Sequence, residues 1–353
     1  MWAQNRLTEM LQLQWPILQA PMGEYTTPEL AAAVSNAGGL GALGMCGFSA
    51  KEVESRITGF REQSKGGLNV NYPLWDDPGD LTNIAMPMRE GVQRLYDDKG
   101  LGPIPTPHAA AGEVSPEHLE VLKSMKPEVI SFHFGLPDQQ IVKQLKATDI
   151  CIMCSATTVA EARHLEENGV DIVIAQGTEA GGHRGTFSGA DVSLQSGLFS
   201  LLPQVVDAVK VPVIAAGGVA DGRAIAAALM LGASGVLVGT AFLRCGEADV
   251  LDTQRAALGA AEEASTILTD LMSGRKARSI KTRLIEELSR QNLEPLPFPA
   301  QYSLTLPFEE TGDKDFMELF AGQSVALTRE MSAADLVQTL AEETTSCLES
   351  RLL

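Results

Sequence analysis

VDIVIAQGTEAGGHRG, residues 170–185, joins a buried strand to a glycine-rich loop. Residues 172–174 form a β-branched run bounded by glycines, which is typical of a short strand buried on both faces. The loop that follows holds three glycines within five residues, and His183 lies among them. Glycines this dense let a backbone approach a ligand closely. Because α/β proteins place their chemistry in loops at the carboxyl ends of parallel strands, this loop is a candidate site, with a plain surface turn as the alternative.

Segments of the same kind recur along the chain. Eight apolar, strand-like runs alternate with helix-like segments, at residues 13–22, 39–45, 68–75, 128–134, 150–156, 171–177, 211–218 and 235–242. Near-continuous apolar strands separated by helices predict a parallel sheet that is covered on both faces. Eight such units predict an α/β fold, the (β/α)8 TIM barrel. An open doubly wound sheet is the alternative, although no G-x-G-x-x-G motif follows the first strand.

Local signals mark the helices and the tail. Thr27 is a predicted N-cap, and Ser49 with Glu52 forms a predicted capping box. After the last strand, residues 247–293 predict two or three helices, and residues 315–353 predict two more, the second capped by Ser332. We therefore expect a mostly helical C-terminal cap region on the barrel. The expected domains are a barrel at residues 1–246, a cap on the substrate side at residues 247–310, and C-terminal helices at residues 311–353.

Composition narrows the classes of partner. The chain has 353 residues and a formal net charge of −18, so the electrostatic field of the whole protein does not favour binding to nucleic acid or to an anionic membrane. Any bound phosphate must then be held by local backbone N–H groups. There is no signal-peptide pattern and no apolar run long enough to cross a membrane. With five cysteines, an odd and sparse set, we expect a cytoplasmic protein whose cysteines are reduced and bind no metal.

Glycines also end the seventh and eighth strands. Gly217 and Gly218 follow the seventh strand, and Gly239 and Thr240 follow the eighth. In barrels of this kind these two loops often hold a phosphate, at exposed N–H groups and helix N-termini. Tight strand-to-helix turns are the alternative explanation. Because two such sites occur at the expected places in the strand order, we predict a phosphate site here.

Polar side chains gather at the other strand ends. They are neutral amides, a methionine and two histidines, namely Gln19, Met22, Asn69, Asn71, His133, Gln176 and His183. This set suits a flat, neutral, hydrogen-bonding ligand such as an isoalloxazine ring. It does not suit a divalent metal, which would require carboxylates or several histidines.

Several stretches resemble the nitronate monooxygenases, which are FMN-dependent barrels, and are most similar to their bacterial class I branch. The similarity lies in QAPMGEYTTPEL (residues 19–30), NVNYPLW (69–75), ISFHFGLP (130–137), QGTEAGGHRG (176–185), VPVIAAGGVADGR (211–223), GVLVGT (235–240) and PAQYSLT (299–305). The resemblance implies oxidation of an alkyl nitronate by O₂ to a carbonyl compound and nitrite. It implies a small-molecule substrate as partner and leaves a homodimer open.

The resemblance also implies roles for single residues. His183 would lie at the reacting face of the flavin, and His133 and Tyr302 would line the substrate pocket. The implied FMN contacts are Met22, Asn71, Gln176, Gly181, Gly218, Leu237, Val238, Gly239 and Thr240. Close relatives carry a tyrosine where this chain has Phe298, and a lysine shortly after Tyr302, where this chain has none before Lys314. This departure puts binding of a carboxylated nitronate in doubt.

Two other functions remain open at this stage. One is an FMN-dependent reductase that takes a hydride from NAD(P)H to reduce an enoyl thioester or a quinone, and consumption of NADH without oxygen would identify it. The other is a phosphate-binding barrel without flavin, either an isomerase or a binding protein, which predicts a colourless protein.

Overall fold

A computed structural model describes residues 2–81, 84–187 and 191–351. Eight parallel strands follow one another in the order β1-β9-β8-β6-β5-β4-β3-β2, and a parallel bridge between Leu18 and Leu40 joins the two end strands. The strands are β1 (Ile17–Gln19), β2 (Gly41–Gly44), β3 (Leu68–Pro73), β4 (Val129–His133), β5 (Cys151–Ala156), β6 (Ile172–Gln176), β8 (Val213–Ala216) and β9 (Gly235–Val238). The predicted (β/α)8 barrel is confirmed.

Eight helices surround the strands. They are α2 (Pro28–Asn36), α3 (Ala50–Gln63), α5 (Pro116–Met125), α6 (Gln139–Lys146), α7 (Val159–Glu167), α8 (Leu198–Ala208), α9 (Gly222–Met230) and α13 (Ala333–Arg351). The last helix packs against both α9 and α2, so the C-terminal segment supplies the eighth helix of the barrel. A further helix, α1 (Arg6–Leu11), sends Leu7 and Leu11 into the cluster that fills the barrel interior.

Alternation along each strand sorts its side chains between two cores. On β9, Leu237 packs with the interior cluster, which includes Leu18, Ile174 and Ile214. Its neighbour Val238 packs instead in the cluster between strands and helices. Successive residues of a strand point to opposite faces, and here the outer face meets the helices.

The predicted helix starts are confirmed. Thr27 accepts a hydrogen bond from the N–H of Leu30 at the start of α2, and Ser49 with Glu52 forms a complete capping box on α3. Ser332 accepts a bond of 3.1 Å from the N–H of Asp335 in the first turn of α13. Each cap satisfies an N–H group that a helix start leaves without an intrahelical partner.

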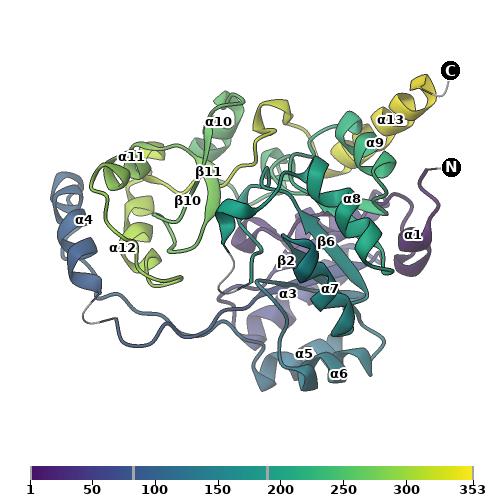
Figure 1. The fold of residues 1–353 in the computed structure, drawn as a ribbon, viewed down its shortest axis with the longest axis horizontal. Helices are drawn as coiled ribbons and strands as arrows, with labels where there is room; N and C mark the ends of the chain where they lie inside the picture. The colour runs from purple at the N-terminus through teal and green to yellow at the C-terminus, as the bar shows by residue number, and fades with distance from the viewer. Residues whose placement is uncertain (1, 82–83, 188–190, 352–353) are drawn as a thin grey trace.

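A second core lies beside the barrel mouth, on the left of Figure 1. It combines α4 (Ala85–Lys99), inserted after β3, with α11 (Arg283–Arg290) and α12 (Tyr302–Thr305) from the tail. The Tyr96 hydroxyl donates a 3.0 Å bond to the carbonyl of Leu304, which ties the insertion to the tail. The second core therefore draws on two separate parts of the sequence.

Two helices, α10 (Asp252–Ala260) and α11 (Arg283–Arg290), occur within residues 247–293 as predicted, but the chain between them forms strands, and the first of the two helices predicted for residues 315–353 does not form. After α10 the chain forms β10 (Thr266–Thr269) and β11 (Ala277–Ile280), which build an antiparallel sheet with β7 (Gly182–His183). Between residues 315 and 327 there are only short 3₁₀ turns in place of the first predicted helix. The largely β-branched run at residues 266–269 is typical of a strand, and the glycine loop offers an extended edge with which β11 pairs. The 3₁₀ turns of the chain are η1 (Gly23–Tyr25), η2 (Val192–Leu194), η3 (Phe242–Arg244), η4 (Leu306–Thr311), η5 (Lys314–Phe316) and η6 (Val325–Leu327).

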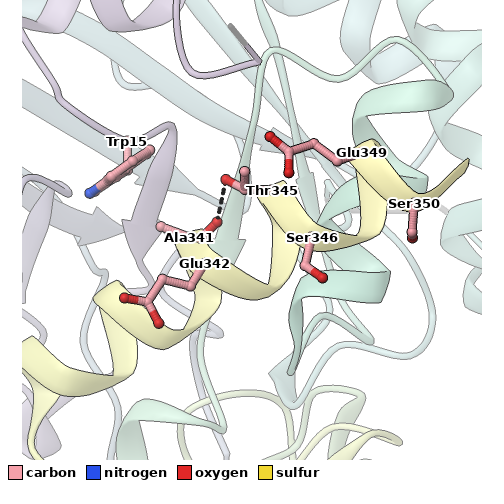
Figure 2. A pocket seen from close by; sticks show the side chains of 7 residues that line it. All are labelled: Trp15, Ala341, Glu342, Thr345, Ser346, Glu349 and Ser350. Atoms are coloured by element: carbon pink, nitrogen blue, oxygen red, sulfur yellow. Dashed lines mark hydrogen bonds between the residues drawn. The ribbon is translucent and has the colours of Figure 1, made fainter. Parts of the chain in front are cut away.

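The N-terminal segment is fastened to α13. Trp2 stacks on Trp15 with ring centroids 5.5 Å apart, and its indole N–H donates a 2.9 Å bond to Thr345. Trp15 and α13 enclose a surface pocket of about 520 Å³, which Figure 2 shows together with the side chains that line it.

Within the described residues, no helix has the length and apolar character needed to cross a bilayer.

Candidate functional site

A pocket of about 700 Å³ opens at the carboxyl ends of the barrel strands. Its walls come from strand-end loops on one side and from the tail segments around Tyr302 and Phe320 on the other. The pocket therefore lies where the barrel meets the second core.

The glycine loop forms one wall of this pocket, and its backbone is held as a strand. His183 pairs with Ala277 of β11, and Gly182 takes a positive φ of 71°. A Cβ atom at Gly181 would fall 2.6 Å from the backbone nitrogen of Gly322, which is too close for any side chain. Glycine is thus required here by the close approach of two backbones.

His183 faces the pocket in the neutral form. Its Nε2 lies 2.9 Å from the Ser273 hydroxyl, which itself donates to the carbonyl of Arg275. Because that hydroxyl hydrogen is already committed, Nε2 carries the proton and donates to Ser273, and Nδ1 is the acceptor of the ring. Burial, helped by His133 and Arg275, lowers the pKa of His183 to about 3. Phe298 and Phe320 contact its ring, with centroids 5.1 and 5.2 Å away.

Two other predicted site residues hold the loop in place. His133 donates from Nε2 to the His183 carbonyl at 3.1 Å and accepts from the Ser155 hydroxyl at 2.9 Å, so this ring is neutral too. Burial lowers its pKa to about 4. The Gln176 amide donates to the same carbonyl at 3.1 Å and accepts from the N–H of Gly185 at 2.8 Å. Both side chains line the pocket, and both fix the backbone that carries His183.

The opposite end of the pocket is made of glycine-rich turns. Gly217 and Gly218 have positive φ angles of 107° and 69°. Ser324 donates a 2.8 Å bond to the carbonyl of Gly218, and the N–H of Gly322 donates a 3.0 Å bond to the Thr240 hydroxyl. The tail therefore closes over both loops that the sequence marked for phosphate.

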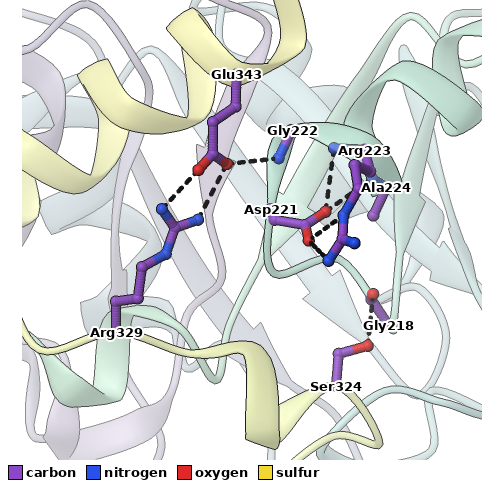
Figure 3. A network of polar contacts seen from close by, with 8 residues as sticks. All are labelled: Gly218, Asp221, Gly222, Arg223, Ala224, Ser324, Arg329 and Glu343. Atoms are coloured by element: carbon purple, nitrogen blue, oxygen red, sulfur yellow. Dashed lines mark hydrogen bonds and ion pairs between the residues drawn. The ribbon is translucent and has the colours of Figure 1, made fainter. Parts of the chain in front are cut away.

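The start of α9 beside these turns is already occupied by carboxylates. Asp221 accepts from the N–H groups of Arg223 and Ala224, and Glu343 of α13 accepts from the N–H of Gly222 at 3.0 Å. Glu343 also pairs with Arg329 at 2.6 Å, as Figure 3 shows. A phosphate in this pocket would accordingly rest on the loop before α9, and not on the first turn of the helix itself.

Most of the sequence-predicted residues come together around this pocket. Those lining it are Met22, Asn71, His133, Gln176, Gly181, His183, Gly218, Leu237, Gly239, Thr240 and Tyr302. Asn69 and Val238 are buried and do not line it. Asn69 lies two residues below Asn71 on the same face of β3, and Val238 points to the helices. Within the described residues, no group of three or more His, Cys, Asp or Glu side chains is arranged to hold a metal ion.

Sequence reasoning missed a carboxylate on the tail side of the pocket. Glu318 is only 5% exposed, and its Oε2 accepts a 2.6 Å bond from the Tyr302 hydroxyl. Burial, with a smaller contribution from Glu309, raises the pKa of Glu318 to about 8. Ser273 was missed as well. Neither residue belongs to a recognisable motif, and only the folding of the tail brings them to the pocket.

Comparisons with known proteins agree with this geometry. A family model described as nitronate monooxygenase matches residues 4–343. A protein of Staphylococcus aureus (strain Newman) described as a probable nitronate monooxygenase is 37% identical over 336 residues, which is 93% of each chain. A solved structure of nitroalkane oxidase from Streptomyces ansochromogenes has a TM-score of 0.90 and 35% identity, covering 98% of this chain and 99% of that one. FabK from Thermotoga maritima has a TM-score of 0.77 and 27% identity, covering 98% of each chain. The chain therefore belongs to the nitronate monooxygenase family.

Proposed function

We propose that this protein is an FMN-dependent enzyme that oxidises alkyl nitronates with O₂ to a carbonyl compound and nitrite. The observation that carries the proposal is one pocket with a glycine-lined end, neutral amides and a buried neutral histidine. Membership of the family and the nitroalkane oxidase of Streptomyces ansochromogenes support the same reaction. Five unpaired cysteines support a cytoplasmic location.

The residues present fit FMN. The turns at Gly218 and Gly239 would hold the phosphate, since a Cβ at Gly239 would come no closer than 3.5 Å to its neighbours and the backbone there is open to a ligand. Asn71 lines the pocket while its Nδ2 donates to Ser131, so its Oδ1 can accept from a ring N–H. The Met22 side chain, which lines the pocket, offers an apolar contact for the flat ring of the cofactor. FMN, when bound, would accept the electrons of the nitronate and pass them to O₂.

The protein residues would bind and orient the substrate. His183 stays neutral at physiological pH, so its Nδ1 can accept a hydrogen bond from the substrate, but the lowered pKa makes it a weak base for the α-proton of a neutral nitroalkane. A nitronate has already lost that proton, so no base is needed and the reaction begins on binding. His133 and Gln176 keep the His183 backbone fixed, which preserves the distance between the imidazole and the substrate. Phe298 and Phe320 keep water from the imidazole.

An anaerobic titration of the purified protein with ethyl or propyl nitronate tests this proposal. We expect a yellow protein whose visible flavin spectrum changes on each addition, and which releases nitrite when air is admitted. A yellow protein that ignores nitronate but is bleached by NADH would instead support the reductase. A colourless protein that FMN does not reconstitute would contradict both flavin-dependent functions.

A further inference from the structure

The charged side chains that line the pocket are all acidic. Glu24, Glu52, Glu309 and Glu318 contribute to its walls, and no lysine or arginine among the described residues does so. Glu24 and Glu52 are exposed at the rim, whereas Glu318 is buried and Glu309 is half-buried. The two carboxyl groups that are at least half-buried, Glu309 and Glu318, therefore both come from the tail.

Glu318 keeps one oxygen without a partner. Its Oε2 accepts from Tyr302, and its backbone N–H donates to Glu309 at 3.2 Å. Its Oε1 is buried and has no hydrogen-bond partner among the described residues, although the side chain lines the pocket. A buried carboxyl oxygen without a partner is costly, and a ligand that pairs with it recovers that free energy.

The Glu318 carboxyl is separated from His183 by a single side chain, that of Tyr302. The rings of His183 and Tyr302 are 6.2 Å apart, and the hydroxyl of that same tyrosine contacts Glu318. A substrate whose reacting carbon sits at His183 would therefore direct its tail toward Glu318.

Among the described residues, two guanidinium groups lie behind the His183 end of the pocket, and a third, that of Arg56, lies 4.4 Å from the Phe48 ring near Glu24 and Glu52. The Arg275 guanidinium stacks 3.8 Å from the Phe134 ring and helps to lower the pKa of His183. The Arg184 guanidinium donates hydrogen bonds to the carbonyl of Gln176 and to the side chain of Gln195. None of these three guanidinium groups lines the pocket. The pocket thus favours an anionic group at one end and opposes it at the other.

We propose that Glu318 makes this pocket selective for nitronates whose tail ends in a hydrogen-bond donor, a hydroxyl or an ammonium group, over tails that end in a carboxylate. The inference rests on the proposed function and names the substrate class. A hydroxyl group can donate to Oε1 or accept from it, so it pairs with either protonation state of Glu318. An ammonium group only donates and pairs with the ionised carboxyl. Above pH 8, where Glu318 is ionised, a carboxylate tail would meet a second negative charge with no lysine or arginine among the described residues lining the pocket to compensate it.

The groups that face Glu318 come from several elements. They are Tyr302 of α12, Glu309 of η4 and Tyr25 of η1. Burial is the main reason that the pKa of Glu318 is raised, to about 8, and Glu309 raises it as well, whereas the hydrogen bond from Tyr302 lowers it. Binding of an ammonium tail should accordingly strengthen as pH rises toward 8, whereas binding of a hydroxyl tail should change little.

The test compares kcat/KM of the holoenzyme at about pH 9, where Glu318 is ionised, for four nitronates of similar length, made from nitrobutane, a nitropropanol, a nitropropylamine and nitropropionate. We expect kcat/KM for the hydroxyl and ammonium tails to exceed that of the alkyl tail by about tenfold, the effect of one well-placed hydrogen bond. We expect the carboxylate tail to fall below the alkyl tail by at least about tenfold. A carboxylate tail that equals or exceeds the alkyl tail would overturn the inference.

Variants assign the preference to Glu318. In Glu318→Leu the ratio of donor tail to alkyl tail should fall to about one. Glu318→Gln keeps an acceptor for Tyr302 and a polar group at Oε1, so it should lose the ammonium preference and keep the hydroxyl preference. Glu310→Gln, a neighbouring exposed carboxylate outside the pocket, is the matched control and should keep both ratios. Unchanged ratios in Glu318→Leu would overturn the assignment, and if that variant does not fold, Glu318→Gln alone decides it.

A binding measurement separates this inference from the proposed function. Calorimetric titration of the holoenzyme with butylamine, butanol and butyrate involves no turnover, and we expect the amine and the alcohol to bind more tightly than butyrate. If no nitronate is oxidised but this order holds and depends on Glu318, the proposed function fails and the selectivity stands. If nitronates are oxidised but butyrate binds best, the selectivity fails alone.

Discussion

At the scale of single residues, the proposed function assigns the chemistry and the cofactor's phosphate to different groups of residues. His183 is held by Ser273 on its side chain and by His133 and Gln176 on its backbone carbonyl, so the imidazole has little freedom. The glycines that suit a phosphate lie at the other end of the same pocket. Substitutions at the two ends should therefore have different effects.

His183→Ala should lower kcat by about 10² to 10⁴ with FMN still bound, because it removes the positioned imidazole but not the glycine turns. The loss should be largest for neutral nitroalkanes, which need a proton acceptor, and smaller for preformed nitronates. Oxygen consumption on both substrate forms, together with the ratio of flavin to protein, measures this. Normal turnover in a fully flavinated variant would remove His183 from the mechanism.

Gly218→Asp should instead abolish FMN binding. Gly218 has a φ of 69°, and a side chain there would lie 3.4 Å from Glu179 and 3.7 Å from Ser324. The substitution adds strain, and its carboxylate repels a phosphate. The variant should purify colourless, and its far-ultraviolet circular dichroism should match that of the unsubstituted protein. A fully yellow variant would mean that the phosphate lies elsewhere.

Sequence reasoning located the residues that follow strand ends, because glycine, histidine and amide side chains at those places have few structural explanations. It located Tyr302 only through the family resemblance. It missed Ser273 and Glu318, whose role depends on the tail crossing the barrel mouth. It also included Asn69 and Val238, which do not line the pocket. The sequence shows where a strand ends only to within a few residues, and a residue must lie close to that end for its side chain to reach the pocket.

At the scale of elements, strand pairing places β11 against the glycine loop. Residues 277 and 278 of β11 pair with β7, so β11 carries the backbone opposite His183, while the Thr-Ile-Leu-Thr run of β10 is itself typical of a strand. The pairing of β11 with β7 is a tertiary effect that local propensity does not contain. The caps of α2 and α3, by contrast, were predictable because the capping hydrogen bond forms within a few residues along the chain, although Thr27 also donates to the carbonyl of Glu247.

The position of helix α13 likewise depends on contacts between distant parts of the sequence, because this helix joins the end of the chain to the glycine turns. Glu343 pairs with Arg329 and accepts from the N–H of Gly222, in the network drawn in Figure 3. Glu343→Ala should cost about 1 kcal/mol, because both side chains of the ion pair are about a third exposed. It should also weaken FMN binding several-fold, since the turn at Gly218 loses support from this side.

Thermal unfolding and an FMN titration of the apoprotein measure both effects of Glu343→Ala. The expected fall in Tm is roughly 1–2 °C for a chain of this size. Glu342→Ala is the matched control, because it removes an exposed carboxylate from the same turn of α13. An equal loss in the two variants would mean that the contact with Gly222 contributes nothing.

At the scale of the whole molecule, buried titratable groups make the stability of the fold depend on pH in two opposite directions. His133 and His183 have pKa values lowered to about 4 and about 3 from the usual 6.5, so below pH 6.5 the unfolded chain binds more protons than the fold. Stability is then lost as pH falls toward 4. Glu318 has its pKa raised to about 8 from 4.5, so the fold binds the extra proton. Stability is then lost as pH rises through 8.

The protein should therefore have its highest Tm between about pH 6 and 7, with a decline on each side. The acid decline can reach roughly 3 kcal/mol for His133 alone, since each pKa unit corresponds to about 1.4 kcal/mol. Glu318→Gln removes one ionisation and should flatten the decline between pH 7 and pH 9, while leaving the acid decline in place. Glu310→Gln, which alters an exposed carboxylate nearby, should keep both declines. Scanning calorimetry across this range decides the matter: a decline above pH 7 that persists unchanged in Glu318→Gln would show that Glu318 is not the group protonated in the fold.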